Sequence, residues 1–114
     1  MDNCLFCKII IGEIPADTVY ENEKILAFRD INPQAPVHIL IIPKIHISTL
    51  NDLKVEHTDL VGQLITTASE LAKKEGVADA GYRLGFNCNL AGGQTVFHIH
   101  LHLLGGRKFD WPPG

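Results

Sequence analysis

The stretch His98-Ile99-His100-Leu101-His102-Leu103-Leu104 places three histidines at every second position near the C-terminal end of the chain. Side chains alternate between the two faces of a β-strand, so an extended conformation puts all three imidazoles on one face. The intervening isoleucine and leucines favour a half-buried strand. Imidazole can act as a nucleophile, a proton carrier or a metal ligand near neutral pH, and buried rings need hydrogen-bond partners. The pattern therefore indicates a functional site rather than a row of solvated surface histidines.

The composition is that of an ordinary globular protein. The 114 residues are 46% hydrophobic and 20% charged, and we expect a single domain over residues 1–114. A net charge of −3 disfavours binding to polymeric nucleic acid, which usually needs a basic face, but leaves a mononucleotide open. We see no basic leader and no apolar run of membrane-spanning length. We therefore expect a cytoplasmic protein that binds no membrane and keeps its three cysteines reduced.

Local patterns predict two helices and five strands. A short helix over residues 4–11 would begin after Asn3 as its cap, and a long one over residues 55–75 carries apolar residues at helical spacing. The predicted strands are 18–21, 25–29, 38–42, 82–87 and 95–104. Because the strands cluster in the sequence and are interrupted once by the long helix, we predict an α+β fold. Its sheet should be mainly antiparallel, with about five strands.

A glycine pair precedes the histidines, in the loop Asn89-Leu90-Ala91-Gly92-Gly93-Gln94-Thr95. Paired glycines allow the backbone to approach a ligand closely and can turn N–H groups toward an anion. Gln94 and Thr95 add neutral hydrogen-bond donors. A Gly-Gly loop alone is usually only a turn, but beside three aligned histidines it predicts a phosphate-binding loop that faces a nucleophile. His38, on another apolar strand, is either a core histidine or a support for this site.

Cys4 and Cys7 are three residues apart, which places both sulfur atoms on one face of the first helical turn. Two such thiolates make half of a tetrahedral zinc site. One alternative is a pair of small buried apolar side chains. A redox pair is disfavoured because no strand precedes the cysteines, as one does in a thioredoxin-like unit.

Several separated segments resemble one protein family. The stretch 98–104 resembles the motif of the histidine triad (HIT) family, in which three histidines alternate with hydrophobic residues. Residues 27–38 (AFRDINPQAPVH), 92–95 (GGQT) and 104–114 (LGGRKFDWPPG) resemble the nucleotide-binding HINT branch of that family. The likeness covers nearly the whole chain. It implies a HIT-like fold and a purine nucleoside phosphoramidase, a hydrolase that cleaves the P–N bond in conjugates of AMP or GMP with amines.

The resemblance implies catalytic roles for four residues. His100 would attack the α-phosphorus and form a nucleotidyl-histidine intermediate, which water then hydrolyses. His102 would contact the phosphate oxygens and stabilise the charge that develops there, while His38 would help to position the triad. Thr95 stands where many HINT proteins have serine. The hydroxyl that would contact the leaving nitrogen is thus kept, with an added methyl group.

The nucleotide would contact residues from several segments. The resemblance assigns the ribose hydroxyls to Asp30, the base pocket to Ile31 and its apolar neighbours, and the region of ribose and phosphate to Asn87. The complete set implied for nucleotide binding is Asp30, Ile31, Asn87, Gly93, Gln94, Thr95, His100, His102 and Trp111. Adenosine and guanosine both fit this description, because apolar contacts to a purine accept either base.

The resemblance also completes the metal site. Family members with an N-terminal Cys-x-x-Cys resemble one another in binding structural zinc through two further histidines, which correspond here to His46 and His98. We therefore expect a structural zinc ion on Cys4, Cys7, His46 and His98, and no organic cofactor. Such a site would pin the N-terminal helix against the histidine strand.

The C-terminal segment 109–114 (FDWPPG) is aromatic and rigid, and its two prolines exclude a helix or a central strand. HINT-like proteins form homodimers in which two sheets join across a two-fold axis and the tail tryptophan approaches the partner's pocket. The resemblance thus implies a homodimer in which Trp111 packs near the leaving group of the substrate. A tail folded back on its own domain is the alternative.

Other functions stay open. Within the superfamily, nucleotidyl transferases have glutamine as the third residue of the triad, and DNA-deadenylating enzymes carry additional nucleic-acid modules. Dinucleoside polyphosphate hydrolases share the triad, although the WPPG ending resembles HINT proteins instead. Outside the enzymes, the chain could be a nucleotide-binding module, or a metal-binding module in which the three histidines ligate one ion. Hydrolysis of an adenosine phosphoramidate separates the enzyme from the modules.

Overall fold

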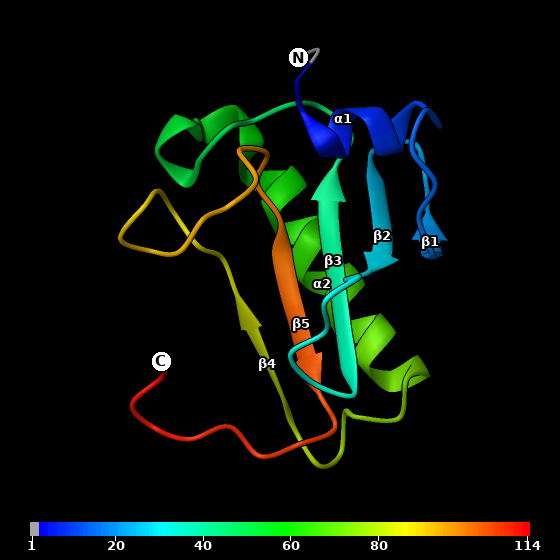
Figure 1. The fold of residues 1–114 in the computed structure, drawn as a ribbon, viewed down its shortest axis with the longest axis vertical. Coiled ribbons are helices and arrows are strands. Elements are labelled where there is room, and N and C mark those ends of the chain that lie inside the picture. The colour runs from blue at the N-terminus through cyan, green and yellow to red at the C-terminus, as the bar shows by residue number, and fades with distance from the viewer. Residues whose placement is uncertain (1–2) are drawn as a thin grey trace.

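Five antiparallel strands form one sheet, and a long helix covers one of its faces (Figure 1). The computed structural model describes residues 3–114, and the strands lie side by side in the order β1-β2-β3-β5-β4. In chain order the elements are α1 (Leu5–Ile10), β1 (Thr18–Glu21), β2 (Ile25–Arg29), β3 (Val37–Pro43), the 3-10 turns η1 (Leu50–Asp52) and η2 (Val55–His57), α2 (Thr58–Lys74), β4 (Tyr82–Gly85) and β5 (Leu101–Gly105). The predicted α+β fold with a five-stranded antiparallel sheet, one short helix and one long helix is confirmed.

The two faces of the sheet carry separate apolar clusters. In β3, Ile39 and Ile41 join the larger cluster, which packs beneath α2 and includes Leu103 of β5. Leu40 lies between them in sequence and belongs to the smaller cluster, together with Phe6 of α1. This alternation follows from the two-residue period of a strand. It places α1 on the face opposite α2, and the site described below lies on the α1 face.

The strand that carries the histidines is shorter than predicted. A strand was expected over residues 95–104, whereas β5 begins at Leu101. Extending the register between β3 and β5 would pair Ile99 with Pro43, and proline has no N–H group to donate to a ladder. The N–H of Ile99 instead donates to the carbonyl of Ile47, at 2.8 Å. The chain directly before β5 therefore lies outside the ladder, and it bends at residues 96–98.

Other boundaries also differ from the predictions. Cys4, not Asn3, caps α1: its sulfur accepts a hydrogen bond from the N–H of Cys7, at 3.3 Å. The long helix begins at Thr58, because the residues before it form the 3-10 turn η2. Strand β4 ends at Gly85, two residues earlier than expected. Within residues 3–114 no helix is long and apolar enough to cross a bilayer.

Candidate active site and metal centre

The three histidines of the triad share one face of the chain, as predicted. The residues between them, Ile99 and Leu101, are buried in the cluster beneath α2, so the imidazoles point to the opposite face. The rings of His100 and His102 are neighbours, with centroids 4.9 Å apart. Only His102 lies within β5, yet the ring of Phe6 contacts both His98 and His100, so the shared face continues before the strand. The alternating pattern therefore predicted the side-chain directions correctly, although it overestimated the length of the strand.

The hydrogen bond made by His100 determines which of its ring nitrogens is free. Its Nδ1 lies 2.8 Å from the carbonyl oxygen of His98, and a carbonyl can only accept, so Nδ1 carries the proton and donates. Burial lowers the pKa of His100, which keeps the ring neutral at pH 7. The unprotonated nitrogen is therefore Nε2, and its lone pair is available as a nucleophile.

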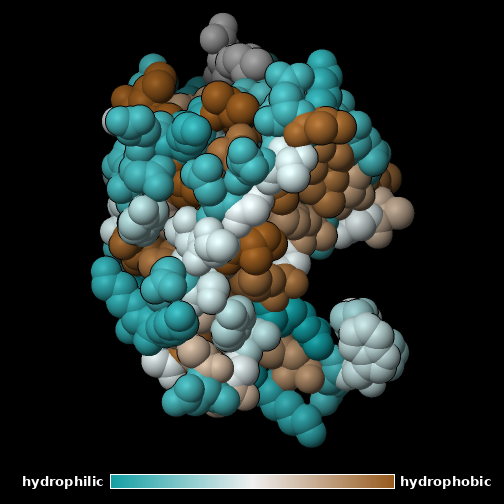
Figure 2. All heavy atoms as spheres, turned by 180° about the vertical axis from the view of Figure 1, so that it is seen from behind, coloured by the Kyte–Doolittle hydropathy of each residue, from teal (hydrophilic) through white to brown (hydrophobic). Residues whose placement is uncertain are grey.

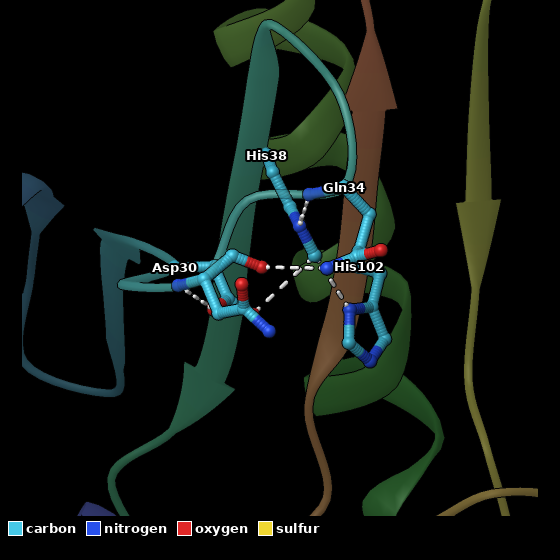
Figure 3. A network of polar contacts seen from close by, with 5 residues as sticks. Asp30, Gln34, His38 and His102 are labelled. Carbon is cyan, nitrogen blue, oxygen red and sulfur yellow. Dashed lines mark hydrogen bonds and ion pairs between the residues drawn. The ribbon is translucent and has the colours of Figure 1, made fainter.

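His102 has the opposite tautomer, which follows from a chain of hydrogen bonds (Figure 3). The backbone N–H of Gln34 donates to Nδ1 of His38, at 3.0 Å, so the proton of a neutral His38 is on Nε2. That Nε2–H lies 2.9 Å from Nδ1 of His102, which must then accept. The proton of His102 is consequently on Nε2, a buried atom without a partner among residues 3–114. A buried N–H group without a partner is suited to donate to a ligand.

Burial also keeps the second pair of rings neutral. It lowers the pKa of His38, against the opposing effect of Asp30, whose carboxylate oxygen is 3.5 Å from Nε2. Burial, together with the nearby His100 and His38, lowers the pKa of His102 to about 4. The site at pH 7 thus holds a neutral nucleophile beside a neutral hydrogen-bond donor, and no cationic imidazole.

His100 and His102 line a mainly apolar cleft with a volume of about 300 Å³. Its lining residues come from α1 and the segment after it, from β2, β3 and β5, and from the loop before the triad: Leu5, Phe6, Ile9, Ile14, Pro15, Ala16, Phe28, Arg29, Asp30, Ile31, Leu40, Thr95, Val96, His100 and His102. An apolar cleft with a few convergent polar groups is the usual form of a small-molecule site. The polar residues among those that line it are Arg29, Asp30, Thr95, His100 and His102.

Gln94 is buried and holds the loop before the triad together. Its side-chain oxygen accepts from the N–H of Asn89, at 2.8 Å, and its amide nitrogen donates to the carbonyls of Ser48 and Val96, at 2.7 and 3.1 Å. Its backbone N–H donates to the carbonyl of Asn89. The donors of Gln94 that were expected to contact phosphate are thus engaged within the protein.

The glycine pair is explained by the turn itself. A Cβ atom on Gly92 would lie 2.5 Å from the carbonyl oxygen of Cys88, so a larger residue does not fit there. Gly93 has a φ of +82°, which favours glycine, and its N–H donates to the carbonyl of Leu90. Neither glycine lines the cleft.

The structure brings together some of the residues expected to bind the nucleotide and not others. Those that line the cleft are Asp30, Ile31, Thr95, His100 and His102, with His38 behind them. Those that do not line it in this chain are Asn87, Gly93, Gln94 and Trp111. Trp111 lies on the C-terminal tail and is 84% exposed.

Two contributors were missed by sequence reasoning. The ring of Phe6 meets His98 and His100 edge-on, with centroids 5.9 and 5.1 Å away. Its position between two cysteines on a predicted helix is compatible with burial but gives no sign of these contacts. Gln34 contributes a backbone N–H, which every residue except proline has, so no sequence signal identifies it.

The four residues predicted to bind metal converge. Nδ1 of His98 lies 3.4 Å from the sulfur of Cys4 and 3.6 Å from that of Cys7, and Nδ1 of His46 lies 3.3 Å from the sulfur of Cys7. All four ligand atoms are within 4.8 Å of one another. A tetrahedral zinc ion with standard bond lengths separates sulfur and nitrogen ligands by about 3.6 Å. The geometry therefore fits zinc.

The outer nitrogens of the two histidines are also held. Nε2 of His98 donates to the carbonyl of Pro43, at 2.8 Å, which leaves Nδ1 unprotonated toward the sulfur atoms. Nε2 of His46 is 3.1 Å from the hydroxyl of Ser48. Such outer hydrogen bonds usually orient metal-binding histidines. Since His98 faces the cysteines whereas His102 faces His38, the three triad histidines do not converge on one common ion.

Comparison with known proteins identifies the family. Residues 11–109 match the HIT domain family. The chain is 56% identical over 106 residues to the purine nucleoside phosphoramidase of Escherichia coli (strain K12), covering 93% of this chain and 89% of that one. It is 54% identical over 112 residues to the 14 kDa zinc-binding protein of Zea mays, covering 96% of this chain and 87% of that protein.

A solved structure matches equally well. The HIT family hydrolase from Legionella pneumophila Philadelphia 1 superposes with a TM-score of 0.97 and is 60% identical, covering 98% of this chain and all of that one. Agreement in sequence, in fold and in the histidine motif leads to one conclusion. The chain belongs to the HIT domain family.

Proposed function

We propose that this chain is a purine nucleoside phosphoramidase that hydrolyses the P–N bond of AMP– or GMP–amine conjugates through a nucleotidyl-histidine intermediate. One observation carries the proposal: the neighbouring His100 and His102 have opposite tautomers at the polar end of one apolar cleft. One ring offers a lone pair and the other offers a proton. The likeness to a protein named for this activity supports the same assignment.

In the first step, Nε2 of His100 attacks the α-phosphorus. A bond forms between Nε2 and phosphorus, the P–N bond to the amine breaks, and the amine leaves after taking up a proton from solvent water. The Nε2–H of His102 donates to a phosphate oxygen, and a donor in such a place lowers the barrier by about 3 kcal/mol. Thr95 lines the same cleft and is the candidate for contact with the leaving nitrogen. In the second step, water attacks phosphorus and gives up a proton to solvent, the bond between phosphorus and Nε2 of His100 breaks, and the nucleotide is released.

The remainder of the cleft fits the nucleoside. Apolar side chains such as Phe28 and Leu40 form walls against which a purine can pack. Asp30 uses one carboxylate oxygen to accept the N–H of Asn32, at 2.8 Å, and its second oxygen, 3.5 Å from Nε2 of His38, has lone pairs that can accept a ribose hydroxyl. Ile31 is 99% exposed at the rim, where a bound base would cover it.

We further propose that Cys4, Cys7, His46 and His98 hold a structural zinc ion. Four protein ligands close a tetrahedral shell and leave no position for substrate, so the ion would stabilise the fold and take no part in the reaction. Helix α1 has six residues, of which only Phe6 is buried, and a helix this short needs an anchor. The likeness to a protein named as zinc-binding supports the assignment.

We also propose a homodimer in which Trp111 reaches the partner's cleft. The tail stands away from the rest of the molecule and leaves a hollow beside it (Figure 2). Arg83 of β4 holds the tail there by donating to the carbonyl of Asp110, at 2.9 Å. Strand β4 is an edge of the sheet, with unpaired backbone groups available to a second copy. Trp111 would then shape the preference for the amine without taking part in the chemistry.

Turnover of an adenosine phosphoramidate tests the function. The wild-type protein should release AMP from it, and faster than from a dinucleoside polyphosphate, the substrate of the rival branch. The His100→Ala variant should release none, whereas the control His57→Ala, which replaces a histidine of η2 that does not line the cleft, should behave like wild type. Wild-type protein that binds AMP without turnover would instead be a nucleotide-binding module.

A further inference from the structure

We propose that Arg107 is a positioning residue, which determines the tautomers of His38 and His102 from outside the cleft by holding the backbone of Gln34 in place. The inference concerns the arrangement of protons in the free protein. It rests on the proposed function only where turnover is predicted.

Gln34 connects Arg107 to the histidines through its two backbone groups. Its N–H donates to Nδ1 of His38, at 3.0 Å, and its carbonyl accepts a hydrogen bond from Nε of Arg107, at 2.9 Å. The residue lies in the loop between β2 and β3, outside the ladder, and its side chain donates only to the nearby carbonyl of Asn32. Within residues 3–114, the hydrogen bond from Arg107 is therefore the one that connects the Gln34 backbone to a segment distant in sequence.

Arg107 is itself held in a defined orientation. It follows Gly106, whose φ is +90° and on which a Cβ atom would lie 2.8 Å from Cβ of Pro36. This close approach keeps the segment after β5 against the loop that contains Gln34. The guanidinium also lies 4.2 Å from the centre of the Phe109 ring and donates to the carbonyl of Lys108, at 3.1 Å. Contacts at both ends leave Nε directed at the Gln34 carbonyl.

The N–H of Gln34 favours one direction of the hydrogen bonds that follow, and the Asp30 carboxylate, 3.5 Å from Nε2 of His38, favours the same direction. While it donates to Nδ1, a neutral His38 has its proton on Nε2, and His102 must accept at Nδ1 and present Nε2–H to the cleft. If the loop moves away, Nδ1 of His38 can take the proton instead. Nε2 of His38 then accepts from Nδ1 of His102, and Nε2 of His102 presents a lone pair to the phosphate. A phosphate oxygen facing a lone pair gains no stabilisation.

The test uses Arg107→Met, which keeps an unbranched side chain as far as the position of Nε and removes the guanidinium donors. The matched control is Arg83→Met, because Arg83 also lies over the Phe109 ring, at 5.2 Å, and holds the tail but makes no hydrogen bond to Gln34. Long-range ¹⁵N–¹H NMR of the imidazoles reports each tautomer directly. Wild type and Arg83→Met should show His38 and His102 in the Nε2–H form, and Arg107→Met should show both rings as mixtures.

Turnover is the second measurement. The substrate is the unsubstituted phosphoramidate, because its leaving group, ammonia, is too small to contact a distant tryptophan. With this substrate, Arg107→Met should lower kcat about five- to twentyfold and leave KM within about twofold. This pattern is expected when an interaction made in the transition state is lost. Arg107→Lys, which can still donate to the carbonyl, should recover part of the loss.

Two results would overturn the inference: wild-type tautomers in Arg107→Met, or the same mixture in Arg83→Met. Either leaves the proposed function intact. If wild type hydrolyses no phosphoramidate, the proposed function fails, and the NMR spectra still decide the role of Arg107.

Discussion

Phe6 contributes both to the stability of the fold and to the position of His100. Replacing it should therefore lower the free energy of unfolding and the rate of the reaction. The ring is 4% exposed and contacts Phe28, at a centroid distance of 5.4 Å, as well as His98 and His100. Removing such a ring in Phe6→Ala should cost about 3–5 kcal/mol, from lost transfer energy and the cavity left behind. Phe6→Leu keeps most of the volume and loses the three edge-on ring contacts, worth about 0.5–1.5 kcal/mol each, so it should cost about 1.5–4.5 kcal/mol.

The leucine variant should also slow the reaction. With the edge-on contact gone, the His100 ring is less restrained, and its attack on phosphorus should occur about tenfold more slowly, equivalent to about 1.4 kcal/mol. Urea unfolding followed by circular dichroism gives the stability, and single-turnover kinetics well below the melting temperature gives the rate of adduct formation.

The control is Leu64→Ala in α2. Leu64 is fully buried in the cluster on the opposite face, so its loss should cost about 2–5 kcal/mol without touching the site. If Leu64→Ala slows adduct formation as much as Phe6→Leu, the rate reports general loosening and the role of Phe6 is refuted. An unchanged rate in Phe6→Leu would refute it as well.

Four further predictions concern metal, pH and assembly. Protein purified without chelators should contain about one zinc ion per chain by atomic absorption, and Cys7→Ser should lose it and expose α1 to hydrogen exchange; metal-free wild type of full stability contradicts the site. Because burial lowers the pKa of His100, the acid limb of kcat/KM should lie below the usual histidine value of about 6.5, and a limb above that value contradicts the assignment. The pKa of His102 is lower in the folded protein (about 4) than in the unfolded chain, so its contribution to stability is complete above pH ~6.5. That contribution should be lost progressively as the pH falls toward 4, and urea unfolding across this pH range measures the loss. Deleting residues 111–114 should change the preference among amines while adduct formation on His100 continues; an unchanged preference, or a monomer by sedimentation at micromolar concentration, contradicts the proposed dimer.

The parts of the account that could be predicted from the sequence depend on period and local chemistry. Alternation along residues 98–104 predicted a shared histidine face, because side-chain direction in an extended chain depends only on position. The strand boundary could not be predicted in the same way. It depends on Pro43, which lies far away in the sequence and opposite the chain only after the sheet has formed.

The composition of the site shows the same division. Side chains with recognisable chemistry, such as the two cysteines and His100, could be identified from the sequence and its resemblance to a family. The functions of Gln94 and Gln34 could not, because one depends on which carbonyls surround a buried amide and the other on a backbone N–H. Both are consequences of tertiary contacts, and the sequence has no local sign of them.

The position of the covalent intermediate tests the central claim most directly. Wild-type protein mixed with an adenosine phosphoramidate, quenched in acid-free denaturant within the first turnover and digested, should yield one peptide carrying an adenylyl group by mass spectrometry. Fragmentation should place that group on His100, because Nε2 of this ring has the free lone pair. His100→Ala should form no adduct and should bind AMP within about tenfold of wild type, or about 1.4 kcal/mol. An adenylyl group on another residue, or turnover without any adduct, would contradict the account.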